Sequence, residues 1–247
     1  MTKLSIIIPT YNEEGNIGTL LNQVHDVLKS IKTSHEIIIV DDNSKDRTRQ
    51  IVKELQAKIP EIVLIERNNE RGLASAMVAG YNAAHGELLG AMDADLAHDP
   101  NYLPEMLKLI DDNKADFVIG SRYVPGAKFE GKALLNKVAS LVGQTLIKLF
   151  LGLNIKDTSN NYRIFKRSLW EKIKNNLHPD GNVMLTEIVY LASKVNFSAE
   201  GGSSSGGRIT EIPIHYIERR AGKSKLSVFK ETFKFFKNIL KIRRGRK

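Results

Sequence analysis

The sequence of 247 residues contains no cysteine, so disulfide bonds and thiolate metal sites are excluded. A cysteine-free composition suits a reducing compartment such as the cytosol. No run of about 18 uninterrupted apolar residues occurs, so we predict no transmembrane helix, and the apolar run near the N-terminus is too short for a signal peptide. The pattern G-x-G-x-x-G is missing after the first apolar run, which disfavours a dinucleotide-binding oxidoreductase.

Acidic residues are nearly missing from the segment 219–247, which holds 12 lysines and arginines beside Glu231. This segment carries a net charge of +11, whereas residues 1–218 carry −2. It predicts a surface for phosphates, nucleic acid or anionic lipid. Its large apolar side chains recur at helical spacing: Phe229, Phe233, Phe236 and Leu240. We interpret this as an interfacial amphipathic helix; the alternative is a helix docked on the core with a solvated basic face.

Short apolar runs rich in β-branched residues alternate with amphipathic stretches over the first 120 residues. Such runs are typical of strands buried on both faces, and their alternation with helices predicts βαβ units and a mainly parallel sheet. The predicted strands are 4–8, 36–40, 62–65, 87–92 and 116–120, and the predicted helices are 13–31, 47–59, 73–84 and 101–113. The fold class is therefore α/β.

The second half of the chain has a different pattern. Residues 132–153 and 182–195 have helical periodicity, and 208–218 alternate like a half-exposed strand. Residues 199–207 form a Gly/Ser-rich loop, for which a natural loop and an engineered linker are both open, and we assign it no function. We expect one domain over 1–218, followed by the basic segment 219–247.

Polar residues follow four of the predicted strands directly, at 9–13, 41–44, 93–95 and 121–122. Ligands of open parallel sheets bind at the carboxyl ends of the strands, so we expect these clusters to form one composite site. Asp93 and Asp95 could share one divalent cation with a bound diphosphate, because Mg²⁺ and Mn²⁺ prefer carboxylate, phosphate and water oxygens. A solvated turn is the alternative, and Asp99 before Pro100 is expected to begin a helix.

Five motifs occur in order at fitting intervals: IIIPTYNEEGNI, EIIIVDDNSKDRT, NERGLASAMVAGYNAAHGE, MDADLAHDP and GSRYVPG. Together they resemble a family-two glycosyltransferase with the GT-A fold, in the dolichyl- and polyprenyl-phosphate mannosyltransferase-like branch. The resemblance covers about residues 3–125 and resumes in DTSNNYRIF, EIPIHY and RRAGKSKL. It implies a Rossmann-like, mainly parallel sheet flanked by helices, with the basic amphipathic helix at the C-terminal end.

The resemblance also implies roles for individual residues. The matching positions, in chain order, are Pro9, Tyr11 and Glu13 bordering the nucleotide, Val40 and Asp42 at the base and ribose, Asp93, Ala94 and Asp95 at ribose, metal and diphosphate, Arg122 on phosphate, and Arg219 and Lys225 near the donor diphosphate and acceptor phosphate. Each position has a structural alternative: a helix start, a turn with its cap, an ion pair or a solvated charge.

The function implied by the resemblance is transfer of a sugar, with GDP-mannose favoured as donor, to a polyprenyl or dolichyl phosphate with inversion and with Mg²⁺ or Mn²⁺. An ionised phosphate acceptor needs no general base. Alternatives are a UDP-glucose donor, or a hydroxyl acceptor, for which Glu187 or Asp157 would be the base. We expect a peripheral enzyme at the cytoplasmic face of a membrane, with a membrane-anchoring partner possible. Nucleic acid is disfavoured as a partner because the basic segment has no reading motif and the acidic strand ends would repel phosphate without metal.

Ala97 stands where relatives in this branch commonly have a glutamine that can supply a metal ligand. Water, a diphosphate oxygen, His98 or Asp99 could complete the shell instead. We predict a looser metal site than the family norm.

Overall fold

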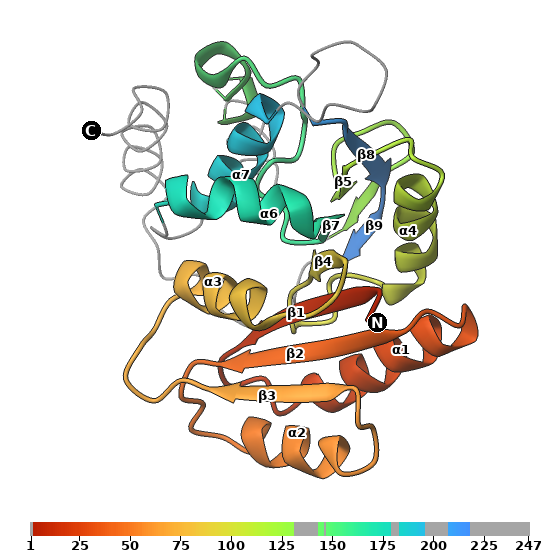
Figure 1. Cartoon of the computed structure of the whole chain (residues 1–247). Coiled ribbons are helices and arrows are strands. Elements are labelled where there is room, and N and C mark those ends of the chain that lie inside the picture. Colours follow the sequence, from red (N-terminus) through yellow and green to blue (C-terminus); the bar gives the residue numbers. More distant parts are fainter. Residues whose placement is uncertain (1, 131–142, 146, 179–182, 196–206, 218–247) are drawn as a thin grey trace.

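The computed structural model describes residues 2–130, 143–145, 147–178, 183–195 and 207–217 (Figure 1). The predicted amphipathic helix of the tail, Arg219, Lys225 and nearly all of the Gly/Ser-rich loop lie outside these residues. Of the predicted helix over 132–153, the described residues 143–145 and 147–151 are helical. Within the part of the chain that the structure describes, every helix is too short or too polar to cross a bilayer.

A seven-stranded sheet forms the centre of the molecule, in the order β3-β2-β1-β4-β7-β5-β8 (Figure 1). All neighbouring pairs are parallel except those of β7, which runs antiparallel to both β4 and β5. The bounds are β1 Leu4–Thr10, β2 His35–Asp41, β3 Ile62–Glu66, β4 Leu88–Ala91, β5 Phe117–Ser121, β7 Arg163–Lys166 and β8 Ile209–Pro213. The predicted α/β class with a mainly parallel sheet is confirmed.

The helices cover both faces of this sheet. The main helices are α1 Ile17–Ser30, α2 Thr48–Gln56, α3 Leu73–Ala83, α4 Leu103–Asp111, α6 Arg167–Ile173 and α7 Val183–Lys194, with short 3₁₀ turns η1 Pro100–Tyr102 and η2 Lys174–Asn176. One core joins α1, α2 and α4 to the sheet, and a second core joins α3, α6 and α7 to the opposite face. Along β1, Ile6 and Ile8 enter the first core and Ile7 enters the second, which explains why this strand is apolar at successive positions.

Close packing fixes α3 against β1. A Cβ added at Gly80 would lie 2.5 Å from Cγ2 of Ile7, so glycine is required for this approach.

The predicted strand over 208–218 is found as two strands with different partners. β8 joins the large sheet beside β5, whereas β9, His215–Ile217, pairs in parallel with β6, Lys128–Glu130. The chain therefore leaves the large sheet at Ile214 and packs beside the end of β4, where Tyr216 reaches His98.

Candidate active site

The first two strands end in a turn that is built around Asp41. Its carboxylate is completely buried, accepts hydrogen bonds from the backbone N–H of Ser44 at 3.0 Å and from the Ser44 hydroxyl at 2.5 Å, and forms an ion pair with Arg49. Asp41 therefore stabilises the loop, in agreement with the turn-and-cap alternative for this motif.

Asp42 points toward a different set of partners. Its Oδ2 accepts the backbone N–H of Gly72 at 2.8 Å, and its Oδ1 lies 3.0 Å from Nη1 of Arg67. Arg67 is 7% exposed and also donates to Glu70 in the loop before α3 and to Ser75 in the first turn of α3. Asp42 thus ties the ends of β2 and β3 together, and its carboxylate lies at the carboxyl edge of the sheet.

Tyr11, just after β1, is the most accessible of the residues expected at the nucleotide, with 45% of its surface exposed. The Arg71 guanidinium lies 4.6 Å from the centre of its ring and donates to its hydroxyl at 2.8 Å. Such a stacked aromatic–arginine pair presents a planar face to a ligand such as a nucleobase. Arg67 and Arg71 are residues that the sequence reasoning missed.

The other residues expected at the nucleotide lie deeper. Val40 is fully buried in the core under α3, so only its backbone can reach a ligand. Pro9 pairs with Val40 across the β1–β2 ladder. The Glu13 carboxylate accepts a hydrogen bond from Asn16 at 2.8 Å, at the start of α1, as the helix-start alternative describes.

Asp93 and Asp95 follow β4, as predicted. Oδ1 of Asp93 accepts from Nδ2 of Asn161 at 2.9 Å, and Oδ1 of Asp95 accepts the backbone N–H of Ala97 at 3.1 Å. Leu96, between Asp95 and Ala97, adopts a left-handed conformation with φ of 63°, which turns the chain back toward Asp95. No hydrogen bond from any described residue reaches Oδ2 of either aspartate. Each carboxylate therefore keeps one oxygen for an external ligand.

His98 supports this turn from below. It is 1% exposed, stacks on Tyr162 at 5.0 Å, and its Nδ1 accepts the backbone N–H of Asp93 at 3.1 Å. Burial holds the pKa of His98 below its usual value, against the opposing effect of Asp93 and Asp95. Nδ1 carries no proton because it accepts this N–H, so the ring is neutral with its proton on Nε2, which lies 3.9 Å from Oδ2 of Asp93. Neither nitrogen therefore has a lone pair to offer a metal.

Asp99 begins the turn η1, because its Oδ1 accepts the backbone N–H of Asn101 at 2.9 Å, and the expectation that it starts a helix is confirmed. Ala94 and Ala97 are each 4% exposed.

Arg122, after β5, forks onto Asp157. Nε and Nη2 donate to the two carboxylate oxygens at 2.8 and 2.7 Å, and the Arg122 backbone N–H adds a third bond at 3.0 Å. Burial alone would lower the pKa of Arg122, but the hydrogen bonds to Asp157 outweigh it and raise the pKa above its usual value. The ion-pair alternative is thus present, and in a buried form, since the Asp157 side chain has no exposed surface.

Glu187, the other acid considered as a base, is also engaged. It is 3% exposed on α7, and its two oxygens accept from the backbone N–H of His178 at 3.0 Å and contact Nδ1 of the same residue at 2.8 Å. Both acids therefore have protein partners among the described residues.

Arg163 at the start of β7 is completely buried and was also missed by the sequence reasoning. It donates to the backbone carbonyls of Thr158, Asn160 and Leu185 and so holds the loop 157–162 against α7. The signal in the sequence was an arginine between the apolar residues of the run YRIF. In a buried strand such a cation has no access to solvent and must find protein partners.

The residues present fit a divalent cation that is shared with a ligand. Among the described residues, no group of three or more histidines, cysteines or acids could enclose a metal ion. Each of the two aspartates has one oxygen, Oδ2, that no hydrogen bond among the described residues reaches. Such a pair suits Mg²⁺, which usually binds through one or two carboxylates plus substrate phosphates.

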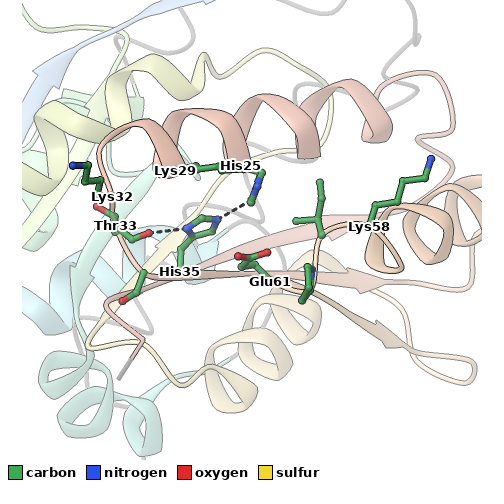
Figure 2. A pocket seen from close by; sticks show the side chains of 10 residues that line it. His25, Lys29, Lys32, Thr33, His35, Lys58 and Glu61 are labelled. Carbon is green, nitrogen blue, oxygen red and sulfur yellow. Dashed lines mark hydrogen bonds between the residues drawn. The ribbon is translucent and has the colours of Figure 1, made fainter.

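A cavity of about 490 Å³ lies at the opposite edge of the sheet, near the amino ends of β2 and β3 (Figure 2). His25, Lys29, Lys32 and Lys58 line it, and Nδ1 of His25 lies 3.2 Å from Nε2 of His35. The lysines cluster where α1 and α2 end, and cations stabilise helix C-termini. None of the residues 93–97 lines this cavity, and the carboxyl edge of the sheet remains the candidate active site.

The doubly covered α/β sheet with paired aspartates at its carboxyl edge agrees with the GT-A fold that the sequence motifs resemble. The sequence profile named Glycosyl transferase family 2 matches residues 5–174, and the chain belongs to that family.

Curated relatives are dolichol-phosphate mannosyltransferase of Pyrococcus furiosus, 34% identical over 97% of this chain and 63% of its own length, and polyprenol monophosphomannose synthase of Mycolicibacterium smegmatis, 33% identical over 90% of this chain and 80% of its own length. The chain thus spans less than two thirds of the Pyrococcus protein.

The fold is shared with glucosyl-3-phosphoglycerate synthase from Mycobacterium tuberculosis, whose crystal structure contains Mn²⁺, UDP-glucose and phosphoglyceric acid. The TM-score is 0.65 at 15% identity, over 99% of this chain and 80% of that one. The GT-A fold expected from the resemblance is confirmed.

Proposed function

We propose that the chain transfers mannose from GDP-mannose to a polyprenyl phosphate, with inversion and with Mg²⁺ or Mn²⁺. Family membership and the names of the curated relatives support this class of acceptor. One observation about the site favours it over a hydroxyl acceptor: Asp157 and Glu187, the two acids considered as bases, are both buried against protein donors.

The acceptor phosphate needs no base. Its second ionisation lies near pH 6, so an anionic oxygen is present at neutral pH. That oxygen attacks the anomeric carbon, the bond between this carbon and the donor phosphate oxygen breaks, and the diphosphate departs with the electron pair. No proton is transferred, so positioning and charge stabilisation account for the catalysis.

The residues at the carboxyl edge of the sheet have different proposed roles. Tyr11, Asp42 and the backbone of Val40 would bind the nucleoside, whereas Asp93 and Asp95 would hold the cation. When bound, the cation neutralises charge on the departing diphosphate. Arg122 contributes positive charge beside this edge while Asp157 fixes its orientation. Arg219 and Lys225 are proposed to contact the donor diphosphate and the acceptor phosphate.

The basic segment 219–247 is proposed to bring the protein to an anionic membrane surface. Each lysine or arginine near such a surface contributes about 1 kcal/mol. The cytoplasmic face is the proposed location, with a membrane-anchoring partner as an additional contact and no role for nucleic acid.

The test is a transfer assay on the full chain with radiolabelled GDP-mannose or UDP-glucose, with Mn²⁺ or with chelator. Polyprenyl phosphate and the matching polyprenol form a controlled acceptor pair that differs only by the phosphate. We expect metal-dependent product from polyprenyl phosphate with GDP-mannose and none from polyprenol. Transfer to polyprenol alone, or equal transfer with chelator present, would refute the proposal.

A further inference from the structure

The carboxylate of Asp93 is held by Asn161, a residue 68 positions further along the chain. Nδ2 of Asn161 donates to Oδ1 of Asp93 at 2.9 Å. If the amide were turned round, its Oδ1 would face Oδ1 of Asp93 at that distance, and two acceptors cannot form a hydrogen bond. The nitrogen of the amide therefore faces the carboxylate. Asn161 is 2% exposed, which makes this contact a built feature of the interior and not a surface encounter.

The sheet itself places the two residues opposite each other. β7 is antiparallel to β4, with Leu88 paired to Lys166 and Ala91 paired to Arg163. Continuing this register two residues past each strand end brings position 93 opposite position 161. The amide of Asn161 therefore reaches the carboxyl edge of the sheet because β7 is antiparallel. The other side chains at this edge follow parallel strands.

Other contacts hold the loop 157–162, which carries Asn161, in place beside the end of β4. Arg163 donates to the backbone carbonyls of Thr158 and Asn160, and Nδ2 of Asn160 donates to the carbonyl oxygen of Gly120 at 2.5 Å. The Tyr162 hydroxyl reaches the carbonyl of Asp99 at 2.8 Å. Asn161 is thus positioned by its neighbours on both sides before any ligand binds.

The consequence concerns the geometry of the carboxylate. Because Oδ1 of Asp93 accepts from Asn161, Oδ2 is the oxygen that no hydrogen bond among the described residues reaches, with Nε2 of His98 3.9 Å away. The carboxylate cannot rotate without losing its bond to Asn161. A second atom points to a ligand at this place: Oδ1 of Asn161 is buried and has no hydrogen-bond partner among the described residues. Buried carbonyl oxygens are normally paired, so this oxygen marks a place where a donor or hydrated cation is accepted.

We propose that Asn161 is the positioning residue of the cation site: it orients Asp93 for single-oxygen binding and replaces part of the support that Ala97 cannot give. This inference rests on the proposed cation at Asp93 and Asp95. Partners that orient metal-binding carboxylates typically change metal affinity by about 10- to 100-fold when they are removed.

The experiment measures Mn²⁺ binding by electron paramagnetic resonance in the presence of saturating GDP, without turnover. Asn161→Ala is compared with Asn160→Ala, a neighbour of the same type and the same 2% exposure that faces a backbone carbonyl instead of Asp93. Thermal unfolding in chelator is recorded for both. We expect Asn161→Ala to weaken Mn²⁺ binding by about tenfold or more, and Asn160→Ala to lower the unfolding temperature while Mn²⁺ affinity stays within about twofold of the original.

The outcomes separate the two proposals. If the original chain does not bind Mn²⁺ with GDP, the proposed metal-dependent function fails. If the original chain binds it and Asn161→Ala binds equally well, the role of Asn161 fails alone. Equal weakening by both variants would likewise overturn it, because the effect would then come from the loop as a whole. Asn161→Leu, which keeps the size without the donor, must behave as Asn161→Ala does.

Discussion

The buried pair of Arg122 and Asp157 makes a prediction that distinguishes an ion pair from a catalytic base. Asp157→Asn keeps the size of the side chain and removes its charge. Three hydrogen bonds from Arg122 converge on this carboxylate, whose side chain has no exposed surface, and the Arg122 side chain is 15% exposed. Because the substitution leaves a buried guanidinium without its counter-charge, the free energy of unfolding should fall by about 3–5 kcal/mol.

For a chain of this length a loss of 1 kcal/mol lowers the unfolding temperature by roughly 2–4 °C, so the expected change is roughly 6–20 °C. Urea unfolding followed by circular dichroism gives the free energy directly. A double-mutant cycle with Arg122→Met isolates the interaction, and the double variant should recover part of the loss.

The same variant is assayed for transfer to polyprenyl phosphate across pH. Because Asp157 takes no proton in the proposed reaction, the acid limb of the pH profile should keep its position even where the rate falls. A variant of unchanged stability that lost its activity together with that acid limb would refute the reasoning and identify Asp157 as a base.

Three further predictions concern other sites. Burial would raise the pKa of Asp116, but hydrogen bonds from Arg208 and Lys166 lower it from 3.8 to about 2. The ionised carboxylate therefore stabilises the folded protein fully above about pH 4, and this stabilisation is lost as the pH falls through 2. Asp116→Asn should flatten the dependence of the free energy of unfolding on pH in that window. Arg163→Lys should cost at least about 3 kcal/mol in urea unfolding, because Nε, Nη1 and Nη2 of Arg163 reach three separate carbonyls and a single ammonium nitrogen cannot lie near all of them. An unchanged midpoint would contradict this. Ala97→Gln should tighten Mn²⁺ binding in titration calorimetry, and unchanged affinity would mean that position 97 does not face the ion.

The parallel part of the sheet could be predicted because its information is local. Each of the first three strands is an apolar run followed by its own helix, and the side chains after it reach the carboxyl edge through topology alone. The antiparallel β7 could not be predicted in this way, since its four residues follow a polar loop and not a crossover helix, so no local pattern shows the direction of this strand or its pairing with β4 and β5. The contacts that depend on β7, from Asn161 to Asp93 and from Arg163 to its loop, were therefore invisible in the sequence.

The sequence pattern alone also could not show which of two neighbouring acids stabilises the loop and which is available to a ligand. Asp41 and Asp42 are adjacent and chemically identical, and their roles differ because alternate residues of a strand end face opposite sides. Asp41 turns inward onto Ser44 and Arg49, whereas Asp42 faces Arg67 and Gly72. Arg67 and Arg71 come from the loop after β3, whose direction depends on the packing of α3.

The partners of the acids explain why donor and cation should bind together. Asp41, Asp42 and Asp157 each face an arginine among the described residues, whereas Asp93 is held by a neutral amide and lies beside a neutral histidine, and Asp95 is held by a backbone N–H. The hydrogen bonds to both aspartates at the end of β4 thus come from neutral groups, and the buried Arg163 acts on Asp93 only through its charge. The two carboxylates would repel a diphosphate that arrived alone. In the proposed function a divalent cation would remove this repulsion, and the diphosphate would supply oxygens that two aspartates cannot. Each ligand would then raise the affinity for the other by the same factor, as linkage requires.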